Sequence, residues 1–558
     1  MLKSFLFCSL AFSGLAHALP QVKLGKTVVS GRAVSDAVEF FGGIPYAEPP
    51  LGALRLHPPV LKTRLSTPSF NASSHGKACI QPLVDDLTTL SEDCLTVSIW
   101  RPAGLSAKDK VPILFWTYGG AYQVGSSGKE DGANLVARSV ARGTPIIYVS
   151  FNHRLGSLGF PQGQEGAFFV NLGFTPEARS DCEATVEDRR VVNLGIQDHT
   201  AALEWIHANI RFFGGDASKV TAFGESSGSV VISIQYLNPG FARLVRGAIF
   251  ESGQLNCLPN YEAAENEQAW QALVGNLPSC ASIATSGNTL ACVRNATTEE
   301  VTAAVLASWS NPWAPVIDKG KGSVYPDYAT NIYAKGRFAR IPFIAGSNLD
   351  EGTAFTAHDE LNDEALKTLL VGQNGPALPG SERALEKAVD GILELYPDDP
   401  QVGSPYGTGD ELFGLPSSYK RLSSIYNDLV FLAPRRQWSQ AAAHFGVKSY
   451  GYQFSHPQGT PVLGVTHGAE IAYVHGSVDP SDSAGQTFSN VVMDYWISFT
   501  VSLDPNDGRG SERPIWPRYT EQNIVLLQLE GGNTTLLKDD FRKEQNKFLI
   551  QSAPALRR

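Results

Sequence analysis

The chain has 558 residues, 43% of them hydrophobic, and a formal net charge of −10. This hydrophobic content suffices for a large core, in two domains or in one large α/β domain. The acidic balance argues against nucleic acid as a partner, which would need a basic face, and no apolar run beyond the N-terminus is long enough to span a membrane.

Residues 1–18 are typical of a secretory signal. Lys3 precedes an apolar stretch from Ser4 to Leu15, and Ala16-His17-Ala18 supplies a small-residue cleavage pattern. Without Cys8, six of the seven cysteines remain, an even number suited to disulfides in an oxidising compartment. We therefore expect a secreted, extracellular protein without a stable membrane anchor, whose residues 19–558 form one domain. Three Asn-x-Ser/Thr sequons, a motif also common by chance, are candidate glycosylation sites: Asn71, Asn295 and Asn533.

Short apolar runs typical of buried strands alternate with helical stretches along the chain. Val22 to Val38 predicts an opening hairpin with its turn near Gly31-Arg32. Asn193 to Phe213 predicts a helix, and residues 258–312 and 359–443 look largely helical. This alternation predicts one α/β domain with a central, mostly parallel sheet. The strand-like runs are Leu95–Trp100, Val111–Trp116, Pro145–Ser150, Lys219–Phe223, Gly247–Ser252, Ile341–Ala345, Lys448–Phe454 and Ile524–Leu529.

One pentapeptide, Gly224-Glu225-Ser226-Ser227-Gly228, separates a strand-like run from the apolar, helix-like run Ser229–Leu237. A bare Gly-x-Ser-x-Gly is more often a chance turn than a catalytic site. Between a strand and a helix, however, its glycines permit a tight turn that exposes Ser226 Oγ above the sheet edge and aims the first helical N–H groups at the atom under attack. This context favours Ser226 as a nucleophile.

Candidates for the acid and the base follow the serine in the order that an α/β-hydrolase requires. Asp350-Glu351 comes directly after the strand-like run at Ile341–Ala345, and from the residues alone either carboxylate, or a merely solvated acidic turn, fits. Of the five later histidines, only His467 lies in a glycine-rich loop after the next strand-like run. A loop histidine by itself is more often a surface residue, but as the third member of an ordered set His467 is the candidate base.

Motifs along nearly the whole chain resemble the type-B carboxylesterases and lipases, a group that includes secreted fungal lipases, sterol esterases and cholinesterases. The strongest joint signature is Ser91-Glu-Asp-Cys-Leu95 with Phe223-Gly-Glu-Ser-Ser-Gly228. The resemblance implies an α/β-hydrolase fold and carboxylic ester hydrolysis without a cofactor. The other matching motifs are Phe41-Gly-Gly-Ile-Pro-Tyr-Ala47, Tyr118-Gly-Gly120, Asn152-His-Arg154, Phe213-Gly-Gly-Asp216, Glu251-Ser-Gly253, Asp350-Glu-Gly352 and His467-Gly468.

The resemblance also implies roles for single residues. It selects Glu351 over Asp350 as the acid beside Ser226 and His467. It places an oxyanion hole on the backbone N–H groups of Gly120, Ala121 and Ser227, and buried support near the histidine at Glu225 and Ser252. Ala121 and Ser227 depart from the commonest family residues, glycine and alanine, but both positions act through the backbone. The implied disulfides are Cys79–Cys94 and Cys280–Cys292, which leaves Cys182 and Cys257 for a third.

The sequence also bears on two alternative functions and on metal binding. A non-catalytic adhesion protein of the same fold would usually lack the triad residues, and a choline esterase is disfavoured because residues 80–93 contain no aromatic side chain for a quaternary ammonium. No paired histidine or Cys-x-x-Cys spacing indicates a metal, and Asp504 to Gly508 is interpreted as a turn rather than a calcium loop. The expected partner is a small-molecule or lipid ester, with acyl preference and oligomeric state left open.

Residues 80–93 are too few for the long amphipathic flap that covers the site in the long-lidded fungal lipases. We therefore expect an open pocket and no jump in activity when a substrate passes its solubility limit. A rival lid is the apolar stretch Phe168, Phe169, Val170, Leu172 and Phe174 within residues 161–192, which contains Cys182.

Overall fold

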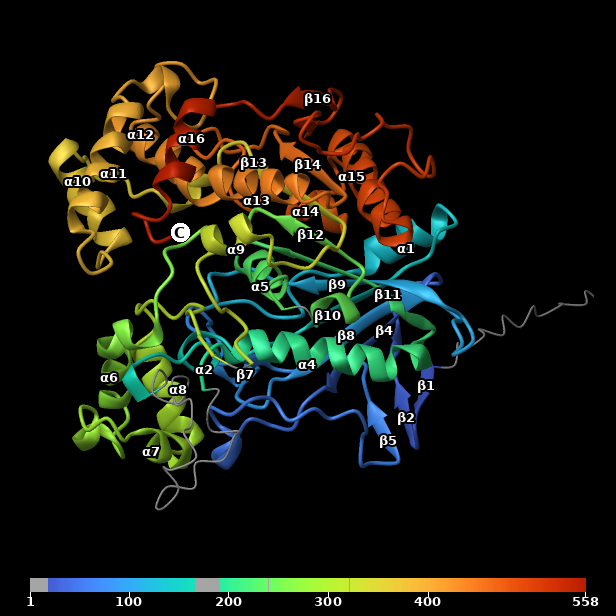
Figure 1. The fold of residues 1–558 in the computed structure, drawn as a ribbon. Helices are drawn as coiled ribbons and strands as arrows, with labels where there is room; N and C mark the ends of the chain where they lie inside the picture. Colours follow the sequence, from blue (N-terminus) through green and yellow to red (C-terminus); the bar gives the residue numbers. More distant parts are fainter. Residues whose placement is uncertain (1–18, 166–190, 239, 321) are drawn as a thin grey trace, which may run out of the picture.

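The computed structural model describes residues 19–165, 191–238, 240–320 and 322–558 (Figure 1). The expected signal at residues 1–18, the rival lid stretch and Cys182 lie outside these ranges. Among the helices of the described part, none combines the length and the apolar character needed to cross a membrane.

An 11-stranded sheet runs through the centre of the protein in the order β16-β15-β14-β13-β12-β11-β9-β10-β8-β4-β3. The strands from β15 to β10 are parallel to their neighbours, and antiparallel strands occupy both edges. This confirms the predicted α/β fold with a mostly parallel sheet. The strands are β3 (Arg32–Ala33), β4 (Val38–Pro45), β8 (Thr96–Pro102), β9 (Val111–Thr117), β10 (Ile147–Phe151), β11 (Gly215–Glu225), β12 (Gly247–Glu251), β13 (Phe343–Asn348), β14 (Ser449–Phe454), β15 (Val525–Leu529) and β16 (Thr535–Lys538).

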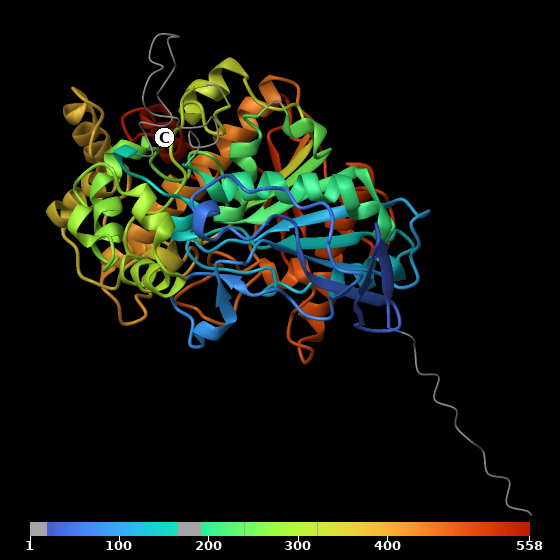
Figure 2. The ribbon, with the colours of Figure 1, turned by 90° about the horizontal axis from the view of Figure 1, so that it is seen from below.

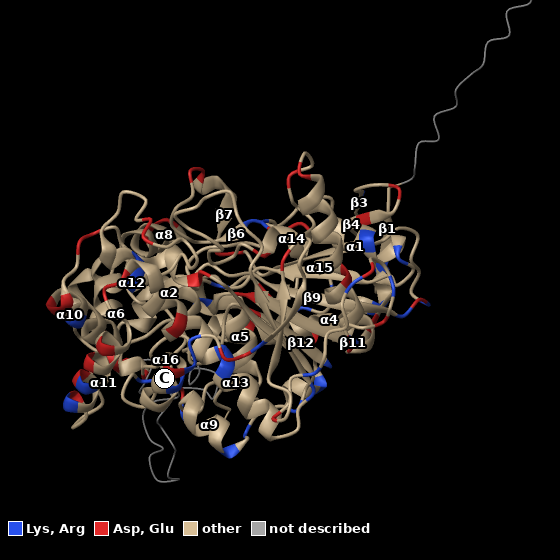
Figure 3. Cartoon of the chain, turned by 90° about the horizontal axis from the view of Figure 1, so that it is seen from above, with Lys and Arg blue, Asp and Glu red and all other residues tan. Residues whose placement is uncertain are grey.

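Helices cover both faces of the sheet, so its middle strands are buried on both sides. Every residue of β10, β12, β13 and β14 is buried, which explains why these segments read as continuous apolar runs rather than alternating ones. Helices α1 (Ala133–Ala141) and α15 (Ser483–Ser502) lie together on one face, whereas α4 (Leu194–Asn209), α5 (Ser227–Gln235) and α13 (Ala433–His444) pack on the other (Figure 3). In the same view lysines and arginines lie interspersed with the acidic residues.

The opening hairpin forms, but its turn is not where the sequence predicted it. Strands β1 (Gln21–Leu24) and β2 (Thr27–Ser30) are joined at Gly25-Lys26, and β2 also pairs with β5 (Ser69–Asn71) in a small separate sheet (Figure 2). Gly31 serves close packing instead, because a Cβ there would lie 2.2 Å from the carbonyl oxygen of Phe40. The prediction of a turn near Gly31-Arg32 is therefore wrong.

Two groups of helices stand beyond one end of the sheet, and the C-terminus lies between them (Figure 1). The first group contains α6 (Glu267–Gly275), α7 (Leu290–Asn295) and α8 (Thr298–Ala307); the second contains α10 (Asp363–Asn374), α11 (Glu382–Leu395), α12 (Ser417–Tyr426) and α16 (Lys543–Ser552). Each group has its own small apolar core. A π-helix, Asn427–Leu432, joins α12 directly to α13. Such π-helical turns are rare and often occur at functional sites.

Candidate active site

Ser226 stands on a sharp turn between β11 and α5. Its backbone has φ 54° and ψ −128°, a strained conformation for a residue other than glycine, and its N–H donates to the Glu251 carbonyl of the neighbouring strand (2.9 Å). A Cβ at Gly224 or Gly228 would lie 2.6 or 2.0 Å from the carbonyl oxygen of Thr117. Both glycines are therefore required by the close approach of β9, and the serine is held where the sequence predicted an elbow.

Three backbone N–H groups beside the elbow are free to bind a ligand oxygen. Within the described residues, the N–H groups of Gly120, Ala121 and Ser227 donate no hydrogen bond. Ala121 adopts a φ of 55° in the position where glycine is commonest, so its methyl group does not prevent the loop conformation. The N–H of Tyr122 donates to Ser227 Oγ (3.3 Å), which ties the loop to the start of α5. An alanine at position 227 would lack this hydroxyl acceptor.

The two adjacent acids Asp350 and Glu351 point to different partners. Glu351 follows β13, is fully buried, and its Oε2 lies 2.6 Å from Nδ1 of His467. Its Oε1 accepts from the N–H of Asn348 (2.6 Å), and its own N–H donates to Asn427 Oδ1 (3.0 Å) in the π-helix. Glu351 is therefore positioned to orient the histidine.

Asp350 instead fixes the loops around the site. Its Oδ2 accepts from the N–H of Val465, two residues before His467 (2.9 Å), and its Oδ1 accepts from Ser404 Oγ and the N–H of Tyr406 (both 2.8 Å). The structure thus places Asp350 away from the His467 ring, with a role in holding the backbone of the histidine loop.

The second ring nitrogen of His467 is directed toward the elbow. His467 Nε2 lies 3.0 Å from Oε1 of Glu225, the residue before Ser226, but the contact lacks hydrogen-bond geometry, so neither atom has a hydrogen-bond partner. Ser226 Oγ and His467 Nε2 are likewise not hydrogen-bonded. Catalytic hydrogen bonds are often long or misaligned in the absence of substrate and form when it binds.

Three buried glutamates act on this histidine, Glu225, Glu351 and Glu470, and a fourth, Glu251, lies near Glu225 and Glu470. Burial raises the pKa of Glu225 to about 8 and that of Glu470 to about 7. Burial alone would lower the pKa of His467, but the charges of Glu225 and Glu351 outweigh it and raise the value to about 9. The site therefore stabilises an imidazolium strongly.

Ser252, expected near the histidine, contacts it only indirectly. Its Oγ donates to Glu470 Oε1 (3.1 Å), and Asn348 Nδ2 donates to Glu470 Oε2 (2.6 Å). The sequence analysis missed Glu470 and Asn427, both within hydrogen-bond reach of the residues around His467. The only available signal was that Glu470 follows His467 by three residues, which by itself indicates no role.

Ser226 opens into a cavity of about 360 Å³. Its wall is mostly apolar and comes from α5, the π-helix and the segment after β13, so it suits the hydrocarbon part of an ester. Rings of Phe355 and Phe431 lie against the His467 ring, with centroids 5.0 and 4.7 Å away. The lining residues are Ala121, Tyr122, Ser226, Ser227, Val230, Ser252, Cys257, Leu258, Phe355, Gln373, Tyr426, Leu429, Val430, Phe431 and Arg558.

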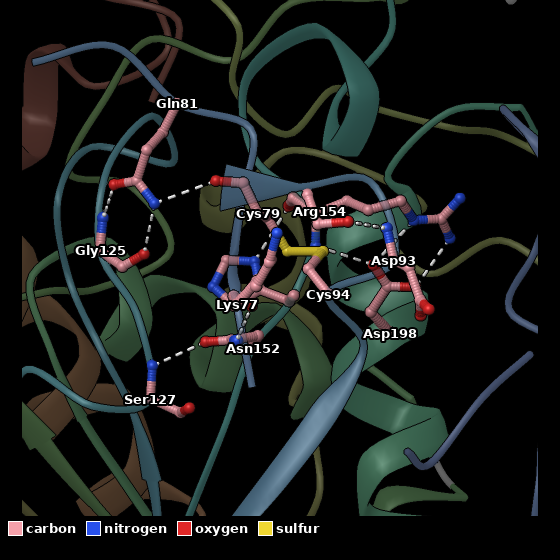
Figure 4. Close-up of a disulfide and its surroundings, with 12 residues drawn as sticks. Lys77, Cys79, Gln81, Asp93, Cys94, Gly125, Ser127, Asn152, Arg154 and Asp198 are labelled. Carbon is pink, nitrogen blue, oxygen red and sulfur yellow. Dashed lines mark hydrogen bonds and ion pairs between the residues drawn. A yellow bond between two sulfur atoms is a disulfide. The ribbon is translucent and has the colours of Figure 1, made fainter. Parts of the chain in front are cut away.

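The first disulfide loop is fastened to the scaffold close to the free N–H groups. Cys79 and Cys94 form a disulfide, and the Gln81 side chain exchanges two hydrogen bonds with the backbone of Gly125 (2.8 and 2.9 Å; Figure 4). Near the other end, Glu92 forms a buried ion pair with Arg55 (2.7 Å). A loop held at both ends is poorly suited to swing as a flap.

Of the remaining predicted disulfide and glycosylation sites, the structure describes all except Cys182. Cys280 and Cys292 form the second disulfide, whereas the thiol of Cys257 is buried and bonded to no other described cysteine. Because Cys182 lies outside the described residues, the Cys182–Cys257 bridge stays a prediction. The side chains of the sequon residues are all exposed, as a glycan would require: Asn71, Asn295 and Asn533.

In the acidic turn at residues 504–508, the carboxylate of Asp507 binds arginine side chains and is not free to coordinate calcium. Asp507 accepts from Arg142 (2.6 Å) and Arg513 (3.1 Å). Across the described part of the chain, no group of three His, Cys, Asp or Glu side chains is arranged to hold a metal ion.

A parallel sheet, covered by helices on both faces, with a serine on a strand-to-helix elbow, defines an α/β-hydrolase fold. The profile of the carboxylesterase family matches residues 18–175 and 184–549, and the chain belongs to that family.

Known relatives and solved structures agree with this assignment. A secreted triacylglycerol lipase of Gibberella zeae is 31% identical over 96% of this chain and 91% of its own length. A secreted lipase of Botryotinia fuckeliana is 30% identical, covering 95% and 92% of the two chains. The crystal structure of Aspergillus niger EstA shares the fold with a TM-score of 0.79 at 22% identity, over 96% of this chain and 99% of that one. The protein is accordingly a carboxylic ester hydrolase.

Proposed function

We propose that the protein is a secreted serine esterase that cleaves carboxylic esters through an acyl-enzyme on Ser226. The observation that carries this proposal is the arrangement at the sheet edge. Glu351 holds one ring nitrogen of His467, and the other ring nitrogen lies without a hydrogen bond beside Glu225, the residue before Ser226. The backbone N–H groups of Gly120, Ala121 and Ser227 donate no hydrogen bond to a described residue.

In the first half of the reaction, the Ser226 hydroxyl attacks the ester carbonyl carbon while His467 Nε2 takes its proton. The resulting tetrahedral oxyanion accepts hydrogen bonds from the N–H groups of Gly120, Ala121 and Ser227, each worth about 3 kcal/mol of barrier lowering by analogy with other oxyanion holes. Imidazolium His467 then protonates the leaving alcohol, and the C–O bond breaks to leave the acyl-enzyme.

In the second half, His467 accepts a proton from water, which attacks the acyl carbonyl carbon. The same N–H groups bind the second oxyanion, and the proton returns to Ser226 as the carboxylic acid leaves. Glu351 remains ionised throughout, keeps Nδ1 protonated and stabilises the imidazolium. When they are ionised, Glu225 and Glu470 add negative charge near the ring, which favours the same charged intermediate.

The substrate is an ester whose acyl group fits a cavity of about 360 Å³ with a largely apolar wall. Relatives named as lipases and structural neighbours named as esterases leave both small esters and glycerides as candidates. The fastened first disulfide loop supports a site open to dissolved substrate. Secretion is supported by the N-terminal pattern and by the names of the relatives.

Labelling with a fluorophosphonate probe tests the central assignment, since such probes react with activated serines. Mass spectrometry should find the adduct on the peptide that contains Ser226. The Ser226→Ala variant should carry none, while the exposed helix-end control Ser502→Ala labels like the wild type. A non-catalytic binding protein, the alternative function, would show no adduct and no turnover of p-nitrophenyl esters of any chain length.

A further inference from the structure

The acid of the candidate triad stands at the first position of a short 3₁₀-helix, Glu351–Phe355. The first N–H groups of a helix have no partner within it and need an acceptor from elsewhere. The preceding residue, Asp350, does not cap the helix, because its carboxylate binds the loops around the site. The Glu351 N–H donates instead to Oδ1 of Asn427 (3.0 Å), which lies on the π-helix, 76 residues further along the chain. The acid is therefore anchored through its own backbone.

The buried amide of Asn427 can be oriented in only one way. A carboxylate only accepts hydrogen bonds and an N–H group only donates them. Oδ1 must therefore face the N–H of Glu351, and Nδ2 must face Oδ1 of Asp428 (3.1 Å). Since Asn427 is 2% exposed and Asp428 is 0% exposed, solvent does not compete for these two bonds.

Asp428 is itself held from a second side. Its Oδ2 accepts from the hydroxyl of Tyr396 (2.7 Å) and from Nε of Arg542 (2.6 Å), so both carboxylate oxygens are used. The Arg542 guanidinium supplies the counter-charge that a fully buried carboxylate needs. A continuous chain of hydrogen bonds thus runs from the Arg542–Asp428 ion pair through Asn427 to the backbone of Glu351.

Close packing joins the two segments at the same place. A Cβ at Gly352 would lie 2.7 Å from the backbone nitrogen of Asn427 and 2.0 Å from the carbonyl oxygen of Ser423 on α12. The turn that carries the acid therefore rests directly on the junction of α12 and the π-helix. Farther along the π-helix, the ring of Phe431 lies against that of His467, with centroids 4.7 Å apart. One short helix thus contacts both the acid and the base.

We propose that Asn427 is a positioning residue for the reaction, which fixes the backbone of Glu351 so that its Oε2 stays 2.6 Å from Nδ1 of His467. Asn427 does not line the cavity, so it acts only through Glu351. The positioned carboxylate holds the imidazole in place and stabilises its charged form while the proton of Ser226 is transferred. This inference rests on the proposed function, with Glu351 as the acid of the triad.

The first test measures kcat for p-nitrophenyl butyrate per active site, counted by fluorophosphonate labelling, so that an unstable variant is not mistaken for a slow one. Asn427→Ala should lower kcat about tenfold and change KM less than about twofold, because a hydrogen bond to the acid is lost while the cavity wall remains. Asn427→Asp has the same size and retains the acceptor oxygen, so it should keep a larger part of kcat. Asn331→Ala, on the exposed face of α9 (Ala329–Lys335), is the matched control and should leave kcat unchanged.

A double-mutant cycle with Glu351→Gln separates positioning of the acid from general loss of structure. The rate constant for labelling Ser226 is measured in the wild type, in each single variant and in the double variant. Asn427→Ala should slow labelling about tenfold when Glu351 is present, but less than about twofold beside Glu351→Gln, since no acid is then left to position. Equal slowing in both backgrounds, or wild-type kcat in Asn427→Ala, would overturn the inference.

Failure of this inference is distinct from failure of the proposed function. A wild type that is not labelled contradicts Ser226 as the nucleophile, whereas a labelled wild type with equal slowing in both backgrounds contradicts only the role of Asn427. If Asn427→Ala does not fold, Asn427→Ser replaces it in the cycle with the same expected outcomes, because the shorter serine side chain does not reach the N–H of Glu351.

Discussion

The catalytic edge of the sheet and the wall of the cavity are built in different ways. At the edge, parallel strands in register bring their ends together, since Glu225 pairs with Glu251 and Glu251 with Gly346. The wall combines residues of α5, the π-helix and the segment after β13, which are far apart in the chain. Backbone hydrogen bonds therefore position the strand ends that carry the chemistry, whereas packing between distant segments shapes the cavity.

The largest effect should follow from removing the nucleophile at the edge. Ser226→Ala is expected to lower kcat for p-nitrophenyl butyrate by about 10⁶-fold, and His467→Ala by a similar factor, because the two act as one unit. His444→Ala, on an exposed helix end, is the matched histidine control. Folding is checked by circular dichroism and secretion yield; a folded Ser226→Ala that keeps more than a few per cent of activity contradicts the assignment.

The adjacent acids should separate orientation of the base from support of its loop. Glu351→Gln is expected to lower kcat by about 10⁴-fold, less than loss of the base itself, because only the orientation and charge stabilisation of His467 are lost. Asp350→Asn should act mainly on stability, by about 1–3 kcal/mol, since it weakens bonds that hold the histidine loop. Kinetics and thermal melting of both variants measure this difference. A larger loss of kcat in Asp350→Asn than in Glu351→Gln would reverse the two roles.

The pH dependence tests the carboxylates around the histidine. His467 must be neutral to act as a base, so kcat/KM of the free enzyme should rise with pH up to about 9, the value to which Glu225 and Glu351 raise its pKa. A negative charge beside the ring favours the imidazolium, so Glu225→Gln should lower this pKa and move the rising limb to lower pH by about one unit. The pH of the rising limb reflects the titration of both Glu225 and His467, because Glu225 itself has a pKa of about 8. A limb that stays in place or moves to higher pH contradicts this electrostatic role.

A smaller effect is expected where the elbow meets the Gly120-Ala121 loop. Ser227→Ala removes the hydroxyl that accepts from the N–H of Tyr122 at 3.3 Å, and should reduce kcat about threefold to tenfold by loosening one side of the oxyanion hole. Ser227→Thr keeps the hydroxyl and is the matched comparison. Full activity in Ser227→Ala would show that the loop is held without this bond.

No change at all is expected when a substrate passes its solubility limit. The first disulfide loop is fastened through Gln81 and Glu92, so the rate against tributyrin concentration should follow one smooth saturation curve. A sharp rise in the rate at the solubility limit would instead indicate a working lid, for which residues 161–192 contain the candidate stretch.

Local sequence patterns predicted most strands of the sheet and much of the candidate site, because each pattern reflects burial or close packing at its own position. Continuous apolar runs such as Val111–Trp116 became β9, buried on both sides, and the glycines around Ser226 are required where β9 passes within van der Waals distance. The hairpin turn was misplaced because Gly31 serves packing rather than turning. Position 31 is distinguished only by its contact with Phe40, on another strand.

Tertiary structure alone decided which groups meet around His467 and along the cavity. Between Asp350 and Glu351, the residues by themselves allow either acid, and the choice depends on which side chain the turn after β13 directs toward His467. Glu470 and Asn427 carry no local signal of their roles, which become visible only in their hydrogen bonds with Asn348 and Glu351. The strands, the elbow and the order of the candidate triad could be predicted from the residues, because these features follow from short-range geometry. The folded chain decided hydrogen-bond partners and cavity chemistry, because they depend on contacts between segments hundreds of residues apart.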